Sequence, residues 1–250
     1  MREPVPSQLK EAVKMESIPK TALVVGATGA VGRELVRQMC EMRPDYGRVI
    51  AWVRKPLNYR HAKLFVEEID FDHMDALPPE QVHDIYCALG TTLKQAGSEE
   101  AFLQVDVEYP KALAQWGRKA GARCFVLVSA PDASRNSKHF YLRAKAKAEK
   151  AVRTAGFRSL VIARAPLIDA QRQDFRWTEL LGIAAFGLFG RLLPGKYDKY
   201  RPMSAGAIAQ AILAATQEPR PGEQVVYPYE FFLPPRADDN ADDDDEAVMG

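Results

Sequence analysis

Cysteine and histidine are scarce in this sequence, and neither forms a cluster. The three cysteines, Cys40, Cys87 and Cys124, lie far apart and include no CxxC pair. The four histidines are equally scattered. An odd number of separated cysteines excludes a disulfide framework and favours a reducing compartment. We therefore expect buried, reduced thiols, no metal site and no catalytic histidine.

Long hydrophobic runs are also missing. The most apolar stretch, residues 180–193, is interrupted by glycines and by Arg191, and it is shorter than the roughly 20 residues that a membrane-spanning helix needs. Residues 1–19 contain several Lys, Arg and Glu residues, a composition that does not fit a secretory signal. These absences predict a protein without a membrane span that resides in the cytoplasm.

Acidic residues are in the minority outside the C-terminal end. Seven acids and no base lie within residues 238–250, and the rest of the chain carries 34 basic against 26 acidic residues, a net charge of +8. The acidic run is typical of a disordered tail. A moderately basic body suits a polyphosphate ligand, although basic residues scattered for solubility are the alternative explanation. We expect a small-molecule partner and no nucleic acid.

Short apolar runs alternate with helical segments between an N-terminal extension, residues 1–19, and the acidic tail, residues 237–250. The predicted strands are residues 22–25, 48–53, 63–69, 84–89, 124–128 and 160–163, with one more edge strand at Val225 and Val226. Helices are predicted over residues 31–42, 98–120, 140–155 and 207–216. This alternation indicates an α/β fold with a doubly wound parallel sheet and right-handed crossovers. Residues 20–236 fit a single domain with a small C-terminal substrate-side region.

A glycine-rich turn follows the first predicted strand. Its glycines have the spacing GxxGxxG, a variant of the dinucleotide-binding fingerprint of Rossmann folds. Glycine lets the backbone turn sharply and approach a pyrophosphate, and the following helix points its positive end at the phosphates. Because the turn lies between a strand and a helix, we predict that it binds a dinucleotide, with a turn that binds nothing as the alternative. The residues predicted to bind are Gly26, Thr28, Gly29, Ala30, Val31 and Gly32.

Two cations, rather than an acid, follow the second predicted strand. Proteins that bind NAD usually place Asp or Glu there, where it accepts a hydrogen bond from the ribose 2′-OH. Here the strand is followed by Arg54 and Lys55, and a guanidinium can bind a 2′-phosphate with two N–H groups. We therefore predict that Arg54, helped by Lys55 and Arg33, selects NADP(H) over NAD(H). Exposed loop charges without a ligand are the alternative.

Two further segments fit a nucleotide groove at the carboxyl ends of the predicted strands. Asp70 and Phe71 follow the third strand, where a side chain can reach the adenine, although Asp70 could equally cap a helix. Leu89, Gly90 and Thr91 follow the fourth strand, where small residues let the backbone pass under the ribose and nicotinamide. All five residues are predicted to contact the cofactor.

The helix predicted at residues 140–155 contains the pattern Tyr-x-x-x-Lys, formed by Tyr141 and Lys145. Residues four apart share one helix face, and a lysine ammonium beside a tyrosine hydroxyl favours the phenolate and so lowers the tyrosine pKa. Such a tyrosine can act as acid or base for a carbonyl or alcohol oxygen. A third group is needed to polarise that oxygen. Ser129, at the end of the fifth strand, is the best placed, with Ser134 and Ser137 as alternatives.

These motifs together resemble the short-chain dehydrogenase/reductase superfamily, in its atypical branch. Residues 87–98, which include the segment Leu-Gly-Thr-Thr, and residues 140–145 are similar to the Tat-interacting oxidoreductase family and its bacterial relatives. The resemblance covers roughly residues 20–215. It implies an NADPH-binding Rossmann domain with Ser129, Tyr141 and Lys145 as the catalytic set. It also places Tyr141, Lys145 and Pro166 at the cofactor, although Arg164-Ala165-Pro166 replaces the Arg-Pro-Gly of many relatives.

Residues after the sixth strand are expected to cover the substrate side. Six apolar residues there could form a lid, with core packing or a homodimer contact as the alternative; they are Phe175, Trp177, Phe186, Phe189, Leu192 and Leu193. Tyr197, Tyr200 and Arg201 are candidates for contact with a polar group. The sequence thus predicts an NADPH-dependent oxidoreductase that transfers hydride to a carbonyl or activated alkene. The alternatives are an NADP(H)-sensing regulator without turnover and a sugar-nucleotide epimerase or dehydratase.

Overall fold

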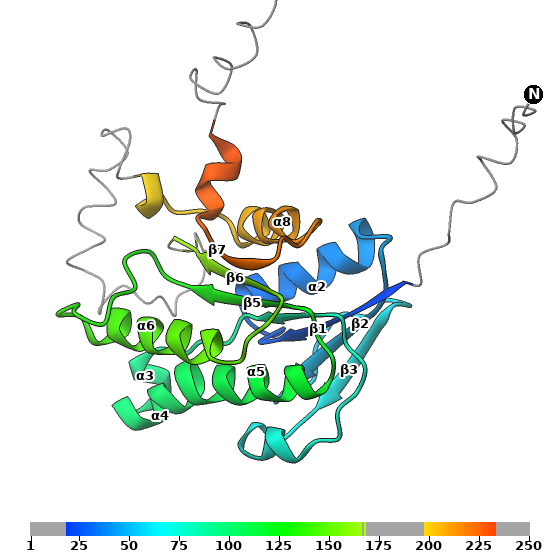
Figure 1. Ribbon diagram of the computed structural model, residues 1–250, viewed down its shortest axis with the longest axis horizontal. Helices are drawn as coiled ribbons and strands as arrows, with labels where there is room; N and C mark the ends of the chain where they lie inside the picture. Colours follow the sequence, from blue (N-terminus) through cyan, green and yellow to red (C-terminus); the bar gives the residue numbers. More distant parts are fainter. Residues whose placement is uncertain (1–18, 167, 169–197, 234–250) are drawn as a thin grey trace, which may run out of the picture.

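The computed structural model describes residues 19–166, 168 and 198–233. Seven strands form one all-parallel sheet in the order β3-β2-β1-β4-β5-β6-β7 (Figure 1). The strands are β1 (Lys20–Val25), β2 (Tyr46–Val53), β3 (Leu64–Glu68), β4 (Asp84–Cys87), β5 (Cys124–Ser129), β6 (Ser159–Arg164) and β7 (Gly222–Val226). The predicted doubly wound α/β fold of a single domain is confirmed.

The order of the strands creates a switch point beside β1. From β1 the chain first adds β2 and β3 on one side and then returns to add β4, β5, β6 and β7 on the other. In open α/β sheets, ligands bind outside the carboxyl ends of the strands at such a switch point. The loops after β1 and β4 therefore mark the expected ligand site.

Helices cover both faces of the sheet (Figure 1). One face carries α2 (Ala30–Met42) and α8 (Ala205–Ala215), which pack against each other and are joined by a hydrogen bond of 2.9 Å from Gln38 Nε2 to the Gly206 carbonyl. The other face carries α3 (Leu93–Ala96), α4 (Glu99–Leu103), α5 (Tyr109–Lys119) and α6 (Phe140–Arg153). Successive strand residues alternate between two apolar cores, one beneath each helical layer, which explains the continuous apolar strand sequences.

The helix predicted over residues 98–120 is interrupted. Between α4 and α5 the chain forms a π-helix, η2 (Gln104–Glu108). Pro110, in the first turn of α5, has no N–H to donate to the carbonyl of Asp106, four residues earlier. The loss of this hydrogen bond explains why the helical path widens at Asp106. Single π-turns inside helices are frequent at functional sites.

Several short elements have no strong sequence pattern and were not predicted. They are the 3-10 helices η1 (Phe71–Ala76), η3 (Asp198–Tyr200) and η4 (Pro228–Phe232), together with α3. Among the described residues, no helix is long and apolar enough to cross a membrane. The predicted N-terminal extension, except for residue 19, the apolar stretch at residues 180–193 and the acidic tail lie outside the described residues.

The three cysteines are buried, as predicted, and each is a free thiol. Burial raises the pKa of Cys40 to about 11 and that of Cys87 and Cys124 to about 12. These thiols are therefore protonated at neutral pH, which makes them poor nucleophiles.

A chain of buried hydroxyl groups links the sheet to α8. The Tyr46 hydroxyl donates to Asp84 Oδ2 at 2.7 Å and lies 2.9 Å from the Tyr86 hydroxyl, which in turn lies 2.8 Å from Thr216 Oγ1. Burial, reinforced by the neighbouring acid and hydroxyls, raises the pKa of Tyr46, so its proton stays in place as a donor to Asp84. Asp84 is itself almost fully buried, and a buried carboxylate is costly without such partners.

Replacing Tyr46 by Phe should therefore destabilise the protein by about 1–3 kcal/mol, because Asp84 loses a buried donor. The matched control is Tyr59→Phe, which removes an exposed hydroxyl that donates to Glu41 and should change the free energy of unfolding by less than about 0.5 kcal/mol. Urea unfolding of both variants measures the difference. Equal effects of the two substitutions would contradict a stabilising role of the buried network.

Candidate cofactor and active site

The glycine turn after β1 lies against the loop after β4. Gly26 has φ +91°, a backbone conformation that favours glycine. A Cβ atom added to Gly26 would lie 2.5 Å from the Ala88 carbonyl oxygen and 2.9 Å from the Leu89 nitrogen. The absence of a side chain at Gly26 is therefore what allows the two loops to meet at the switch point.

The remaining glycines bring α2 close to the turn. A Cβ atom on Gly32 would lie 2.2 Å from the Gly26 carbonyl oxygen, so only glycine fits there. Gly29 is the N-cap of α2 and provides no side-chain cap, and the first turn of the helix has no acid. The first N–H groups of α2 are thus left for an anionic ligand beside Thr28, Gly29 and Ala30, which are exposed. Val31 is buried beneath the turn.

Cations lie at the carboxyl end of β2, as the sequence indicates. Arg54 and Lys55 follow the strand and are exposed. Arg33 is also exposed. Its Nη2 donates a hydrogen bond of 3.1 Å to the Thr28 carbonyl, so its guanidinium lies beside the glycine turn. No acid follows β2 before residue 67, where Glu67 accepts a hydrogen bond from Trp52 Nε1. The position that NAD-binding proteins usually fill with an acid is therefore basic here.

Asp70 and Phe71 have structural roles at the end of β3. Asp70 caps η1 by accepting a hydrogen bond from the Asp72 amide at 3.0 Å, and it pairs with His73 at 2.7 Å. The Phe71 ring is buried, with its centroid 5.5 Å from that of Tyr109. The helix-cap alternative for Asp70 is thus observed, and adenine contacts from either residue stay a prediction.

Tyr141 and Lys145 lie on one face of α6, and Lys145 is held by a buried acid. Lys145 Nζ lies 5.7 Å from the centroid of the Tyr141 ring and 2.7 Å from Asp106 Oδ1. This ion pair does not have the alignment of a hydrogen bond. The other Asp106 oxygen, Oδ2, accepts a hydrogen bond of 2.8 Å from the Thr91 amide. Asp106 therefore connects α6 to the loop after β4, which contains Leu89, Gly90 and Thr91. Asp106 is not among the predicted site residues, because a lone acid in a helical stretch gives no signal in the sequence.

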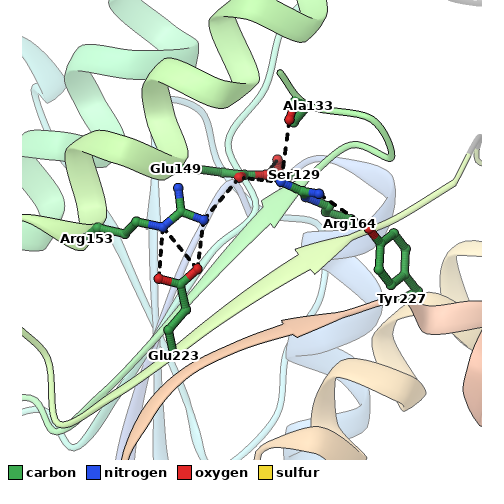
Figure 2. Close-up of polar contacts among 7 residues, drawn as sticks. All are labelled: Ser129, Ala133, Glu149, Arg153, Arg164, Glu223 and Tyr227. Atoms are coloured by element: carbon green, nitrogen blue, oxygen red, sulfur yellow. Dashed lines mark hydrogen bonds and ion pairs between the residues drawn. The ribbon is translucent and has the colours of Figure 1, made fainter. Parts of the chain in front are cut away.

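Ser129 is engaged in a different cluster of polar residues (Figure 2). Its hydroxyl is buried and donates to Glu149 Oε1 at 2.7 Å. Glu149 projects from α6 and also binds Arg164, at the end of β6, through contacts of 3.0 and 2.9 Å. Arg153 links Glu149 to Glu223 of β7. The single O–H donor of Ser129 is thus used inside the protein. Among the described residues, no hydrogen bond joins the Ser129 hydroxyl to Tyr141.

Side chains of η3 hold the loop after β5 in place. Asp132 has φ +57° and accepts hydrogen bonds from Lys199, at 2.5 Å, and from the Tyr200 hydroxyl. Burial opposes ionisation of Asp132, but its two partners outweigh burial and lower its pKa.

The remaining predicted residues are placed as follows in the structure. Ser134 and Ser137 lie further along the loop after β5, and Arg201 is exposed. Pro166 is buried just after β6. Tyr197 and the six residues of the predicted lid lie outside the described residues.

The fold, the glycine turn and the free N-terminus of α2 define a dinucleotide-binding protein of the Rossmann type. Residues 26–182 match the family described as NAD(P)H-binding, and the chain belongs to that family. The match begins at the first glycine of the turn. The predicted NAD(P)-binding Rossmann family is thus confirmed.

The chain is also similar to curated relatives and, in its fold, to solved structures. The chain is 31% identical to "Protein fmp52, mitochondrial" of Aspergillus clavatus over 201 residues, which cover 77% of this chain and 85% of the relative. It is similar in fold to MoeE5 in complex with UDP-glucose and NAD, with a TM-score of 0.61 and 18% identity over 82% of this chain and 75% of that one. A dTDP-4-dehydrorhamnose reductase from Bacillus anthracis in complex with NADP gives a TM-score of 0.57 and 14% identity over 85% and 76%.

The predicted cytoplasmic location is wrong. Relatives from several organisms are named as mitochondrial proteins, which contradicts it. The prediction came from the scarcity of cysteine and the charges in residues 1–19. A reducing compartment and the lack of a secretory signal do not distinguish the cytoplasm from other places inside a cell.

The packing at Gly32 gives a direct test of the turn. Gly32→Ala should weaken NADPH binding about tenfold or more, because the added Cβ pushes the turn away from α2 at a cost of about 1–3 kcal/mol. Gly206→Ala is the control, since its Cβ has 3.4 Å to the nearest atom, Glu34 Oε2. Fluorescence titration with NADPH measures both affinities. Unchanged binding by Gly32→Ala would show that the turn does not hold the phosphates.

Proposed function

We propose that this protein is an NADPH-dependent oxidoreductase that transfers hydride to a carbonyl or activated alkene of a small molecule. The observation that carries the proposal is the placement of Tyr141 and Lys145. They share one face of α6, and Lys145 reaches the loop after β4 through Asp106. That loop borders the glycine turn, which supports a role of Tyr141 and Lys145 at the nicotinamide half of the proposed cofactor.

The residues of the groove fit a dinucleotide. Neighbouring backbone atoms occupy the space that a Cβ atom would fill at Gly26 and Gly32, so the turn packs directly against the loop after β4. The first N–H groups of α2 have no side-chain cap. The backbone of residues 26–30 would hold the pyrophosphate, Arg33 and Arg54 the 2′-phosphate, and Lys145 the nicotinamide ribose. NADPH, when bound, supplies the hydride.

The remaining chemistry belongs to the side chains. The Tyr141 hydroxyl donates its proton to the substrate oxygen as negative charge develops there. Lys145, whose Nζ lies 5.7 Å from the centroid of the Tyr141 ring, would hold the nicotinamide ribose beside this hydroxyl. The predicted catalytic set also contains Ser129, but its proton is used by Glu149, and a hydroxyl has a single proton to donate. We therefore propose that Ser129 acts by positioning α6 through Glu149, and that Tyr141 is the main donor to the substrate.

The choice of cofactor should depend on Arg54. At a hundred times its dissociation constant, NADPH should stabilise the protein by about 2.7 kcal/mol. Arg54→Ala should weaken NADPH binding by about tenfold, because one hydrogen bond to the charged 2′-phosphate is lost. NADH binding should stay the same, because NADH has no 2′-phosphate. The control is Arg60→Ala, an exposed arginine in the same segment. Thermal unfolding with each nucleotide provides the measurement. A wild-type preference for NADH would exclude the proposed selection.

The division of labour between Tyr141 and Ser129 can be tested by turnover. In a screen of carbonyl compounds and activated alkenes, followed by NADPH absorbance, Tyr141→Phe should lower kcat by about 100-fold or more, as expected for loss of a general acid. Ser129→Ala should lower it by less than about tenfold, because the substrate loses no donor. If Ser129→Ala were as damaging as Tyr141→Phe, Ser129 would belong to the catalytic set after all. NADPH binding without turnover of any substrate would favour the sensing regulator.

A further inference from the structure

Two helices that pack against each other, α5 and α6, carry basic residues on their outer faces (Figure 1). On α6, Arg143, Lys147 and Lys150 follow one another at intervals of four and three residues, so they share one face of the helix. On α5, Lys111 and Arg118 are seven residues apart and share a face in the same way. All five except the half-buried Arg143 are exposed. The two helices thus present two adjacent basic stripes.

Little negative charge balances these stripes within the described part of the chain. The one acid that α5 and α6 contain, Glu149, is buried. Lys111 pairs with Glu108, which precedes α5, at 3.3 Å. Among the described residues, Lys147 and Lys150 form no ion pair. A surface with such an excess of one charge attracts a ligand of the opposite charge.

The same chain carries the matching negative charge near its C-terminal end. Residues 238–246 contain seven acids and no base. Leu233 is the last described residue, and a fully extended chain reaches up to about 17 Å from there to Asp238 and about 44 Å to Glu246. Helix α6, with 14 residues, is about 21 Å long. The acids can therefore extend along the whole of α6.

Strand β7 brings the start of the acidic segment close to α6. The chain runs from β7 through η4 to Leu233, and Glu223 of β7 contacts Arg153 of α6 at 2.7 Å (Figure 2). The exposed cations Arg54 and Lys55 follow β2, which is five strands away from β7, or about 24 Å at the usual spacing of strands. The stripes of α5 and α6 are therefore the nearer basic surface, and they carry more cations.

We propose that the outer faces of α5 and α6 are a docking surface for the acidic segment, residues 238–246, of the same chain. The carboxylates of the segment pair with Lys147 and Lys150 of α6 and with Lys111 and Arg118 of α5. A single exposed ion pair contributes little, but several in a row form a contact that salt weakens. The docked segment neutralises the basic face. The proposal does not depend on cofactor binding.

Lysine acetylation of the full-length protein tests the contact. The wild-type protein is compared with a variant in which all seven acids of residues 238–246 are replaced by Asn or Gln, and mass spectrometry follows the acetylation rate of each lysine. At about 0.02 M salt, Lys147 and Lys150 should react about threefold faster in the variant, because several ion pairs keep the segment docked most of the time in the wild type. Lys94, an exposed lysine of α3, is the internal control and should react equally in both proteins. About 0.5 M salt should remove the difference, because it screens exposed charges.

Cross-linking with a carbodiimide identifies the contact directly, because this reagent joins a carboxylate to a lysine amine only where the two touch. In the wild-type protein, we expect cross-links from residues 238–246 to Lys147 or Lys150. A mixture of 14N-labelled and 15N-labelled protein shows whether both ends belong to one molecule. Equal unfolding temperatures of the wild type and the neutralised variant ensure that the two acetylation rates are compared in the same fold.

Three results would overturn the proposal. Equal acetylation rates of Lys147 and Lys150 in the two proteins at low salt would show that the segment does not cover α6. Faster acetylation of Lys55 alone in the variant would place the segment at the cations after β2 instead. Cross-links formed only between different molecules would show that the face binds a second copy of the chain.

Discussion

The close approach of the loops after β1 and β4 is the constraint on which the rest of the site depends. A Cβ atom at Gly26 would collide with the Ala88 carbonyl, and a Cβ atom at Gly32 would collide with the Gly26 carbonyl. These two contacts fix the start of α2 relative to the sheet. They also fix the loop that leads to Thr91. The Thr91 amide binds Asp106, and Asp106 in turn binds Lys145 of α6. A phosphate-binding turn and an acid–base pair from distant parts of the sequence are thus connected by a short series of contacts.

The charges at the carboxyl edge of the sheet are arranged in two ways. Arg54 and Lys55 are exposed, where they can attract a phosphate. The acids of the interior are paired instead: Asp106 with Lys145, and Glu149 with Arg164 and Arg153. Asp106 contacts Lys145 of α6 and accepts a hydrogen bond from the Thr91 amide. Glu149, on α6 itself, contacts Arg164 of β6 and accepts a hydrogen bond from the Ser129 hydroxyl. Helix α6, which carries Tyr141, is therefore held in place by electrostatic contacts at two successive turns.

The sequence predicts the parts of this protein that depend on local pattern. The strands, the glycine turn and the Tyr-x-x-x-Lys pair follow from apolar runs, from glycine spacing and from helical periodicity, and the structure confirms the fold they imply. The partners of Ser129 and Lys145 could not be predicted, because Glu149 and Asp106 meet them only after the helices pack on the sheet. The interruption of the helix at residues 104–108 could have been suspected from Pro110. The location of the protein in the cell is not encoded in composition, and there the prediction failed.

Backbone amide NMR of the 15N-labelled protein during titration with NADPH can locate the cofactor site, since it reports on every part of the groove at once. We expect chemical-shift changes concentrated in residues 26–33, in residues 88–92 and near Arg54, with a smaller effect at the first turns of α6. Shifts confined to another face of the sheet, or none at saturating NADPH, would contradict a cofactor site at the switch point.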